Sequence, residues 1–396
     1  MRKMIKKINK DIITKLFFIK NGLLIITLPD KDKLYIGGQE SNLIAYLNIH
    51  SKNLYNRVIK SGAIGFSEAY INSEISSPDI SKVIFLFSLN RNHNKNIIYG
   101  KKIYNLWNYI KHTLKPNSIS GSKKNISYHY DLGNEFYSKW LDSSMTYSSA
   151  LFENKKDKLS TAQYNKYNSL CEITKIKEGD NILEIGCGWG GFAEFAAKKY
   201  RINITCITLS RKQAEYAQKR VQKEGLSDLI DIKISDYREI SKKYDKIISI
   251  EMFEAVGKKY WPIFFKKLFD NIKDNGIIGM QLISIKDDLY SSYKYNTDFI
   301  QKYIFPGGFL PSIQSLQKIT LEHGLNMNIE KTFGKDYANT LAIWRENFLF
   351  NWNGISKDKI FDIKFKNMWE YYLAYCEAGF LSNSTDVHQI TLKKLN

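Results

Sequence analysis

From about residue 180 onward, short apolar runs alternate with amphipathic stretches. Apolar runs typical of buried strands cover 181–188, 202–210, 230–235, 246–251 and 276–285, and helical spacing covers 191–200, 211–225 and 258–272. Gly225 suits the C-terminal end of the second helix. Strands that alternate with helices in this way predict a mostly parallel sheet with helices on both faces. Ligands of such α/β sheets bind beyond the carboxyl ends of the strands.

The first part of the chain has a different pattern. Residues 22–28 and 83–89 are predicted strands, and 101–114 is a predicted helix. The polar segment 116–124 contains Pro, Gly and Ser, which is typical of a linker. We therefore expect a smaller α+β domain over 1–115, a linker over 116–124 and an α/β domain over 125–396.

Charge also separates these parts. The chain has a formal net charge of +19, and residues 1–115 hold 19 Lys and Arg against 7 Asp and Glu. Such an excess attracts nucleic acid or an anionic membrane surface, although a Lys-rich chain whose charge only aids solubility would have the same count. No apolar run reaches the ~18 residues of a transmembrane helix, so we expect any membrane contact to be peripheral. The four cysteines form no CxxC pair, which indicates neither a zinc site nor a disulfide framework and fits the reducing cytoplasm.

A glycine-rich loop follows the strand at 181–188. It contains Gly186, Gly188, Gly190 and Gly191, with Cys187 and Trp189 between them. The glycines allow the backbone to approach a ligand closely, and the N-terminus of the next helix favours a carboxylate or phosphate. A dinucleotide site would have an acidic residue about 20 positions later, but the next strand ends in Thr208, Leu209 and Ser210. The acidic residue is instead Glu184, just before the first glycine, which resembles motif I of S-adenosylmethionine methyltransferases.

Longer strings resemble the cyclopropane fatty acid synthases and the related mycolic acid cyclopropane synthases. In chain order they are HYDLGN at 129–134, MTYSSA at 145–150, LEIGCGWGG at 183–191, TLS at 208–210 with Gln213, MFEAVG at 252–257, YIFPGG at 303–308, FGKDY at 333–337 and CEAGF at 376–380. The resemblance covers about 125–380, and the N-terminal part resembles more weakly that of the bacterial phospholipid enzymes. It implies a Rossmann-like class I methyltransferase fold for 125–396, and a lipid- or membrane-associating role for the basic domain 1–115.

The resemblance also implies a reaction and a donor site. The enzyme would transfer a methylene group from S-adenosylmethionine to the cis double bond of a phospholipid acyl chain and so form a cyclopropane ring. The implied donor-site residues are Tyr147, Ser148, Glu184, Gly186, Cys187, Gly188, Trp189, Gly190, Thr208, Leu209 and Gln213, with Asp236 near the adenine.

The implied base is a bound bicarbonate. By position, Glu254, Ile283 and Tyr337 match the residues that hold it, whereas Ser149 stands at a cysteine position and Gln281 at a histidine position. Both replacements can still hydrogen-bond an oxyanion, but the departure leaves open whether bicarbonate is the base and what the product is. Cys376 matches a cysteine once considered catalytic in the family. No step requires a thiolate, so we expect Cys376 to serve packing.

Methyl transfer to an alkene leaves a carbocation, so the site needs aromatic faces and must exclude water. Tyr303, Phe305, Tyr337 and Trp189 are the candidate aromatic residues, and each is alternatively a core residue. The apolar residues Ile304, Phe305, Phe309 and Leu310 are candidates for the acyl path, or for the core of a buried loop.

Other functions remain as alternatives. A methyltransferase on another lipid would stop at a methyl-branched product, and a silent lipid-binding protein would not need the intact donor loop. Amino-methylating enzymes for DNA carry an Asp/Asn-Pro-Pro-aromatic string where this chain has residues 249–254, SIEMFE, so we expect no nucleic-acid substrate. We expect phospholipid acyl chains at an anionic surface as the substrate, no metal, and a cytoplasmic location at the inner face of the membrane. The family suggests a homodimer, whereas the sequence leaves the oligomeric state open.

Overall fold

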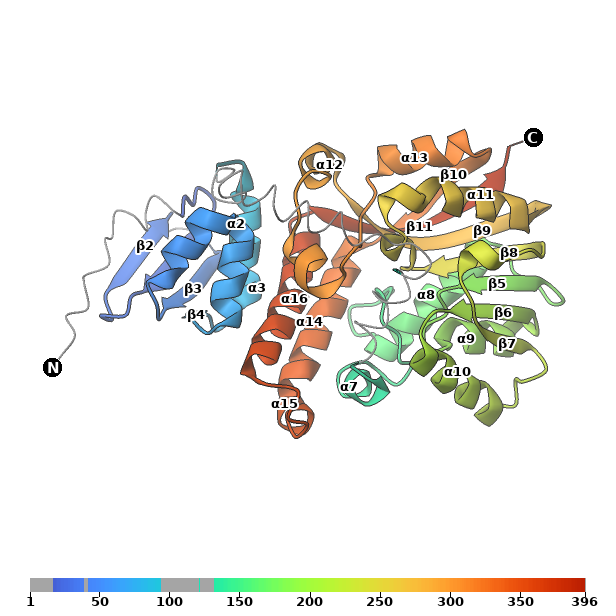
Figure 1. Ribbon diagram of the computed structural model, residues 1–396, viewed down its shortest axis with the longest axis horizontal. Helices are drawn as coiled ribbons and strands as arrows, with labels where there is room; N and C mark the ends of the chain where they lie inside the picture. The colour runs from blue at the N-terminus through green and yellow to red at the C-terminus, as the bar shows by residue number, and fades with distance from the viewer. Residues whose placement is uncertain (1–16, 39–41, 94–120, 122–131, 396) are drawn as a thin grey trace.

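The computed structural model describes residues 17–38, 42–93, 121 and 132–395 (Figure 1). The predicted helix at 101–114 lies outside these residues, and so does the predicted linker at 116–124 apart from Gly121.

The N-terminal unit, residues 17–93, contains a four-stranded sheet and two helices. Its elements are β1 (Leu23–Thr27), β2 (Lys33–Gly37), β3 (Ile44–Ile49), α2 (Asn53–Ile71), β4 (Ile75–Ser76), α3 (Ile80–Leu89) and η1 (Arg91–His93). The strand order is β2-β1-β3-β4, with β1 parallel to β3 and antiparallel to β2. Leu24, Ile26 and Leu47 of the sheet share one buried apolar cluster with Leu54 of α2 and Val83 of α3. The predicted strand at 22–28 is confirmed by β1.

The predicted strand at 83–89 is wrong, because these residues belong to α3. The helix begins after Asp79, whose side chain accepts a hydrogen bond from the Lys82 backbone N–H. Helix α3 packs against β3 and also against α16 (Ile363–Leu381). A helix that is covered on more than one side carries a nearly continuous apolar run, and such a run does not distinguish a buried strand from a buried helix.

The larger sheet has seven strands. In spatial order they are β10 (Leu325–Thr332), β11 (Thr385–Lys394), β9 (Ile272–Ile285), β8 (Tyr244–Ile250), β5 (Asn181–Ile185), β6 (Asn203–Thr208) and β7 (Ile230–Ile234). The pairs from β9 to β7 are parallel, and β11 is antiparallel to both β9 and β10. All five strands predicted after residue 180 are confirmed, and the fold is the expected mixed α/β architecture. The strand order reverses between β5 and β8, so the carboxyl ends of these two strands mark the ligand crevice.

Helices cover this sheet and connect it to the N-terminal unit. They are α7 (Asn134–Ser138), α8 (Leu159–Ile173), α9 (Gly191–Tyr200), α10 (Arg211–Lys223), α11 (Trp261–Asn271), α12 (Asp287–Tyr293), α13 (Ile313–Glu322), α14 (Gly334–Phe350), α15 (Trp352–Ile355) and α16, with short turns η2 (Tyr237–Glu239), η3 (Phe253–Ala255), η4 (Lys258–Tyr260) and η5 (Ile300–Ile304). The predicted helices at 191–200 and 211–225 are confirmed by α9 and α10, and the one at 258–272 by η4 and α11.

Helices α14 and α16 stand between the two sheets (Figure 1). The Tyr371 ring of α16 lies 6.5 Å from the Phe66 ring and 5.7 Å from the Tyr70 ring of α2. Glu68 of α2 also accepts a hydrogen bond from Lys302, at 2.8 Å. The N-terminal unit is thus packed against the same elements that enclose the site. Within the described residues, no helix combines the length and apolar character needed to cross a bilayer.

Candidate active site

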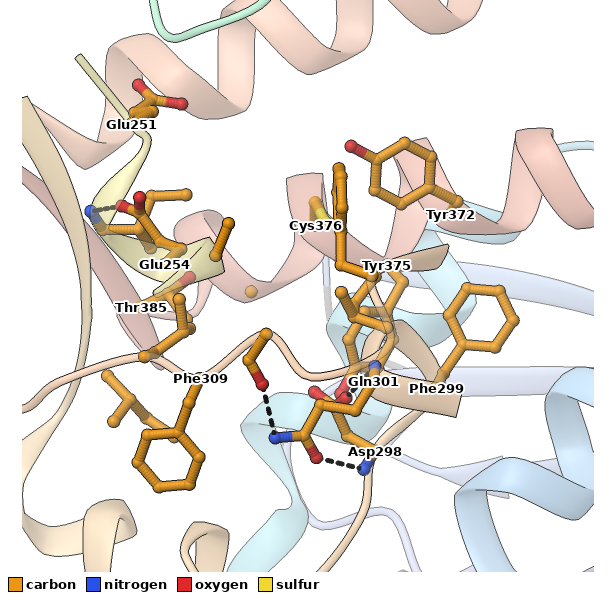
Figure 2. Close-up of a pocket in the computed structure, with 18 of the residues that line it drawn as sticks. Glu251, Glu254, Asp298, Phe299, Gln301, Phe309, Tyr372, Tyr375, Cys376 and Thr385 are labelled. Atoms are coloured by element: carbon orange, nitrogen blue, oxygen red, sulfur yellow. Dashed lines mark hydrogen bonds between the residues drawn. The ribbon is translucent and has the colours of Figure 1, made fainter. Parts of the chain in front are cut away.

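A single cavity of about 930 Å³ begins at the carboxyl ends of β5 and β8 and reaches α2 and α3 of the N-terminal unit. This volume lies within the range of about 300–1,000 Å³ that small-molecule sites occupy. One end is lined by the glycine-rich loop and the other mostly by aromatic and aliphatic side chains. Figure 2 shows the region between them, with Glu251 and Glu254 on one side and Tyr372, Tyr375 and Cys376 of α16 on the other.

Most of the predicted donor residues line this cavity. They are Tyr147, Ser148, Glu184, Gly186, Cys187, Gly188, Trp189, Thr208, Leu209 and Gln213. Gly190 does not line it, and its N–H instead closes the turn by donating to the Cys187 carbonyl at 2.9 Å. Asp236 does not line it either, because its carboxylate is paired with Arg238 at 2.7 Å. Its neighbours Ser235 and Tyr237 face the cavity in its place.

The backbone of the glycine-rich loop suits close approach by a ligand. Gly186 and Gly188 have φ values of 82° and 54°, which side chains rarely adopt. A Cβ atom on Gly186 would lie 2.6 Å from Cγ of Met252, whereas one on Gly188 would enter open space. The Gly186 and Cys187 N–H groups both donate to the Ile207 carbonyl, which fixes the loop to β6. The loop therefore leaves open space for a ligand at Gly188.

Side-chain hydrogen bonds hold the walls of the donor end. The Trp189 indole donates to Asn134 at 2.8 Å, and Thr208 donates to Gln213 at 3.1 Å. Glu184 is buried and accepts a hydrogen bond from the Cys206 thiol. Burial raises the pKa of Glu184 to about 7.

At the junction of the two ends lies Glu251, which sequence reasoning did not single out. It directly follows β8 at the strand reversal. Its Oε1 accepts hydrogen bonds from the Ser149 backbone N–H and from Gln281 Nε2, both at 2.8 Å. Its Oε2 accepts one from the Tyr337 hydroxyl at 2.6 Å. Glu251 is only partly buried because its accessible atoms face the cavity. In the sequence, the only signal for Glu251 was its position, because it is a carboxylate at the end of a predicted buried strand.

Glu254, the predicted acidic partner of the base, also faces the cavity. Its Oε1 accepts a hydrogen bond from the Ile283 backbone N–H at 2.5 Å (Figure 2). Its Oε2 is buried without a partner among the described residues. Burial, and secondarily the charge of Glu251, raise the pKa of Glu254 to about 8. Glu254 therefore holds its proton at neutral pH.

Lys166 of α8 is a second group that the sequence did not reveal. Its side chain is fully buried, and its Nζ donates to the Ser148 hydroxyl at 2.6 Å. Burial lowers the pKa of Lys166 to about 7, and the charge of Glu251 opposes that shift. Burial likewise raises the pKa of Glu251, while Lys166 and the hydrogen bonds from Tyr337, Gln281 and Ser149 oppose the rise. A carboxylate with a raised pKa is a stronger base at neutral pH than an exposed one.

The residues predicted to hold bicarbonate lie close together, but their hydrogen-bond donors are already paired with carboxylates of the chain. Glu254, Ile283 and Tyr337 line the cavity, whereas Ser149 and Gln281 lie behind it, fully buried. Cys376, which we expected to serve packing, also lines the cavity. The Ser149, Gln281 and Tyr337 donors point to Glu251, and the Ile283 N–H points to Glu254. This arrangement does not fit a bound bicarbonate. Burial raises the pKa of the Cys376 thiol, so a thiolate is not favoured there.

The apolar end has the composition of a channel for a hydrocarbon chain. Its lining includes Phe299, Ile300, Phe305, Phe309, Leu310, Tyr371, Tyr375 and Phe380, together with Phe17, Val58, Ile64, Phe66, Ile84 and Phe87 of the N-terminal unit. Of the predicted acyl-path residues, only Ile304 is absent from the lining, because it is buried in the core. Of the predicted aromatic residues, only Tyr303 is absent, and its hydroxyl donates to Glu68 at 2.6 Å.

Comparisons with known proteins identify the family. The family model described as mycolic acid cyclopropane synthetase matches residues 118–390. The chain is 35% identical over 351 residues to tuberculostearic acid methyltransferase UfaA1 of Mycobacterium tuberculosis, a match that covers 86% of this chain and 81% of that protein. It is 34% identical over 360 residues to the cyclopropane-fatty-acyl-phospholipid synthase of Escherichia coli K12, with 88% of each covered.

Similar solved structures support the same family. The cyclopropane synthase MmaA2 of Mycobacterium tuberculosis matches with a TM-score of 0.61 and 26% identity, over 69% of this chain and 98% of that chain. The mycolic acid cyclopropane synthase CmaA1 complexed with SAH and CTAB matches with a TM-score of 0.61 and 27% identity, over the same shares. The chain therefore belongs to the mycolic acid cyclopropane synthetase family of S-adenosylmethionine-dependent lipid methyltransferases, and it is an enzyme of the cyclopropane synthase type.

Proposed function

We propose that this enzyme transfers a methylene group from S-adenosylmethionine to the cis double bond of unsaturated acyl chains in membrane phospholipids, and so forms a cyclopropane ring. The observation that carries the proposal is the single cavity that joins the glycine-rich loop to an apolar channel, with Glu251 and Glu254 at the junction. A polar cosubstrate and a hydrocarbon chain must meet at such a junction for carbon to be transferred between them.

The residues at the junction suit the chemistry. The donor supplies an electrophilic methyl group. The chain itself must hold the alkene against that group, stabilise a carbocation and accept a proton. The rings of Trp189, Phe305 and Tyr337 line the cavity and offer aromatic faces to a cation. The apolar lining keeps water from trapping the cation before the proton is lost.

We propose that residues 1–115 associate with the lipid surface and that residues 125–396 carry out catalysis. The N-terminal unit contributes Val58, Ile64 and Phe66 of α2 to the apolar lining. At Gly62 the backbone of α2 leaves helical geometry, with φ 56° and ψ −128°, where the helix meets the cavity. The basic excess of 1–115 would attract an anionic surface, which supports a peripheral site at the inner face of the membrane.

A methyl-branched product is the second candidate. One relative of similar identity is named for tuberculostearic acid, and the chain departs from the family pattern at Ser149 and Gln281. The alkylation step is the same for both products. The two routes differ in the later fate of the carbocation, which either closes to a ring or leaves a methyl branch.

The test uses the purified chain, S-adenosylmethionine and vesicles of a phospholipid with a monounsaturated acyl chain. Mass spectrometry should show acyl chains heavier by one methylene unit, and proton NMR should show cyclopropane signals with loss of the alkene signal. Vesicles of a saturated phospholipid are the control and should remain unchanged. Retention of an alkene signal in the heavier product would favour the methyl-branched route, and unmodified acyl chains would refute the proposal.

A further inference from the structure

We propose that Glu251 is the resident general base of this enzyme and takes the place of a bound bicarbonate, with Ser149, Gln281 and Tyr337 as its positioning residues. The inference rests on the proposed function, because it assigns the group that accepts the proton in that reaction.

The first observation is the hydrogen bonding of the carboxylate. Glu251 accepts three hydrogen bonds, from the Ser149 N–H, the Gln281 amide and the Tyr337 hydroxyl, at 2.6–2.8 Å. Ser149, Gln281 and Tyr337 are three of the five residues that the family resemblance assigned to an external oxyanion. A carboxylate and a bicarbonate present similar pairs of oxygen atoms to such donors. Glu251 therefore satisfies the donors that would otherwise need an anion from solution.

The second observation is the backbone at Glu251. Its φ of 47° lies in the left-handed region, which glycine adopts readily and which costs other residues on the order of 1 kcal/mol or more. Its N–H still donates to the Gln281 carbonyl at 2.8 Å, so the strand end is well anchored. Strain of this kind persists where the surroundings fix it, and it is concentrated at functional sites.

The third observation is a further set of hydrogen bonds that orients Gln281. Its Oε1 accepts a hydrogen bond from Gln389 Nε2 at 3.2 Å, and Gln389 Oε1 accepts one from the Ser169 hydroxyl at 2.6 Å. Because the carbonyl side of the Gln281 amide is occupied in this way, its NH₂ group faces Glu251. All three side chains are buried, so the network is shielded from water.

The chemical step balances with Glu251 as the base. The π electrons of the alkene form a bond to the donated methyl carbon while the carbon–sulfur bond of the donor breaks, and the sulfur keeps that electron pair. The neighbouring carbon becomes a carbocation. Glu251 then removes a proton from the added methyl group, and the electron pair of that C–H bond forms the third side of the ring. The proton stays on the Glu251 carboxyl group until it is released to water.

The test compares the parent enzyme with Glu251→Gly and Glu251→Gln in buffers freed of carbon dioxide, with and without added bicarbonate or formate. Glycine suits the backbone at this position, and it would leave the Ser149, Gln281 and Tyr337 donors free to bind an added anion. Glutamine fills the same space without a basic oxygen. Calorimetry with S-adenosylhomocysteine and thermal unfolding verify that both variants fold and bind.

We expect the parent turnover to be unchanged by bicarbonate. Both variants should lose roughly 10²- to 10⁴-fold in turnover, the usual contribution of a general base. Added bicarbonate or formate should restore activity to Glu251→Gly and leave Glu251→Gln inactive. Glu254→Gln is the matched control, and formate should not restore any activity that it loses.

Two results would overturn the inference while leaving the proposed function intact. One is an active parent enzyme whose turnover falls when bicarbonate is removed. The other is a Glu251→Gly variant that stays within a few-fold of the parent in buffer without any added anion. A parent enzyme that never modifies unsaturated acyl chains would instead refute the proposed function, and with it the role of Glu251.

Discussion

Tyr337→Phe tests how the carboxylate network controls the reaction. The substitution removes the 2.6 Å hydrogen bond to Oε2 of Glu251. It keeps the ring, whose centroid lies 4.5 Å from that of Phe380 in a stacked arrangement. The effect should therefore come from the lost hydrogen bond rather than from repacking of the core.

The size and direction of the effect follow from that bond. A hydrogen bond to a charged group contributes about 1.5–3 kcal/mol. Its loss corresponds to a fall of roughly 10- to 150-fold in kcat, since about 1.4 kcal/mol equals a factor of ten. The hydrogen bond from Tyr337 lowers the pKa of Glu251, so its removal should raise that pKa. The basic form is then reached at higher pH, and the acid limb of the kcat profile should move to higher pH.

The assay follows conversion of monounsaturated phospholipid vesicles by mass spectrometry of the acyl chains across a range of pH. Tyr303→Phe is the matched control, because its hydroxyl donates at 2.6 Å to Glu68 and not to Glu251. The control should leave the acid limb of the profile in place. A Tyr337→Phe enzyme with the parent rate and the parent pH profile would refute the reasoning that Glu251 depends on this hydrogen bond.

Three further predictions concern the donor loop, stability and the membrane. Gly188→Asp should abolish calorimetric binding of S-adenosylhomocysteine, because it places a negative side chain at the proposed position of the donor's polar end. The control Gly179→Asp lies at an exposed turn with φ 82° and should bind S-adenosylhomocysteine normally. Equal binding by both variants would contradict the loop assignment. Burial raises the pKa of Glu254 from 4.5 to about 8. The protonated Glu254 side chain therefore contributes its full share to the free energy of unfolding below about pH 4.5, and this contribution is lost as pH rises through about 8. In urea unfolding, the stability of the parent relative to Glu254→Gln should fall over this range, and a constant difference would show that Glu254 is not buried as a neutral acid. The chain should sediment with anionic vesicles at low salt and be released as salt rises, and salt-independent binding to neutral vesicles would exclude electrostatic docking through 1–115.

The central part of the fold could be predicted from the sequence because β5, β6, β8 and β9 are largely buried and form apolar runs, and because α9 and α10 directly follow β5 and β6 with clear helical spacing. Ser210, for example, caps α10 by accepting a hydrogen bond from the Gln213 N–H. The strand predicted at 83–89 failed because tertiary packing against β3 and α16, rather than local periodicity, determines the apolar pattern of α3. The antiparallel strands β10 and β11, which closely follow α13 and α16, were not predicted.

The glycine-rich end of the cavity could be predicted because most of its residues stand close together in recognisable strings. The junction with the apolar end was only partly predictable. Ser149, Gln281 and Tyr337 were found by position, but their common partner Glu251 was not, because a single glutamate at a strand end has no local signature. Lys166 illustrates the same limit, since only the three-dimensional structure shows a lysine that is fully buried beside Ser148.

A donor with a trideuterated methyl group allows the transferred carbon to be followed into the lipid. The enzyme acts on monounsaturated phospholipid vesicles, and the acyl chains are then analysed by mass spectrometry and NMR. If the enzyme alkylates the alkene and then removes a proton from the added methyl group, the product carries a ring methylene with two deuterium atoms. Acyl chains without deuterium would contradict the claim that this site transfers carbon to a lipid alkene, and an intact trideuterated methyl branch would contradict ring closure by proton removal from that group.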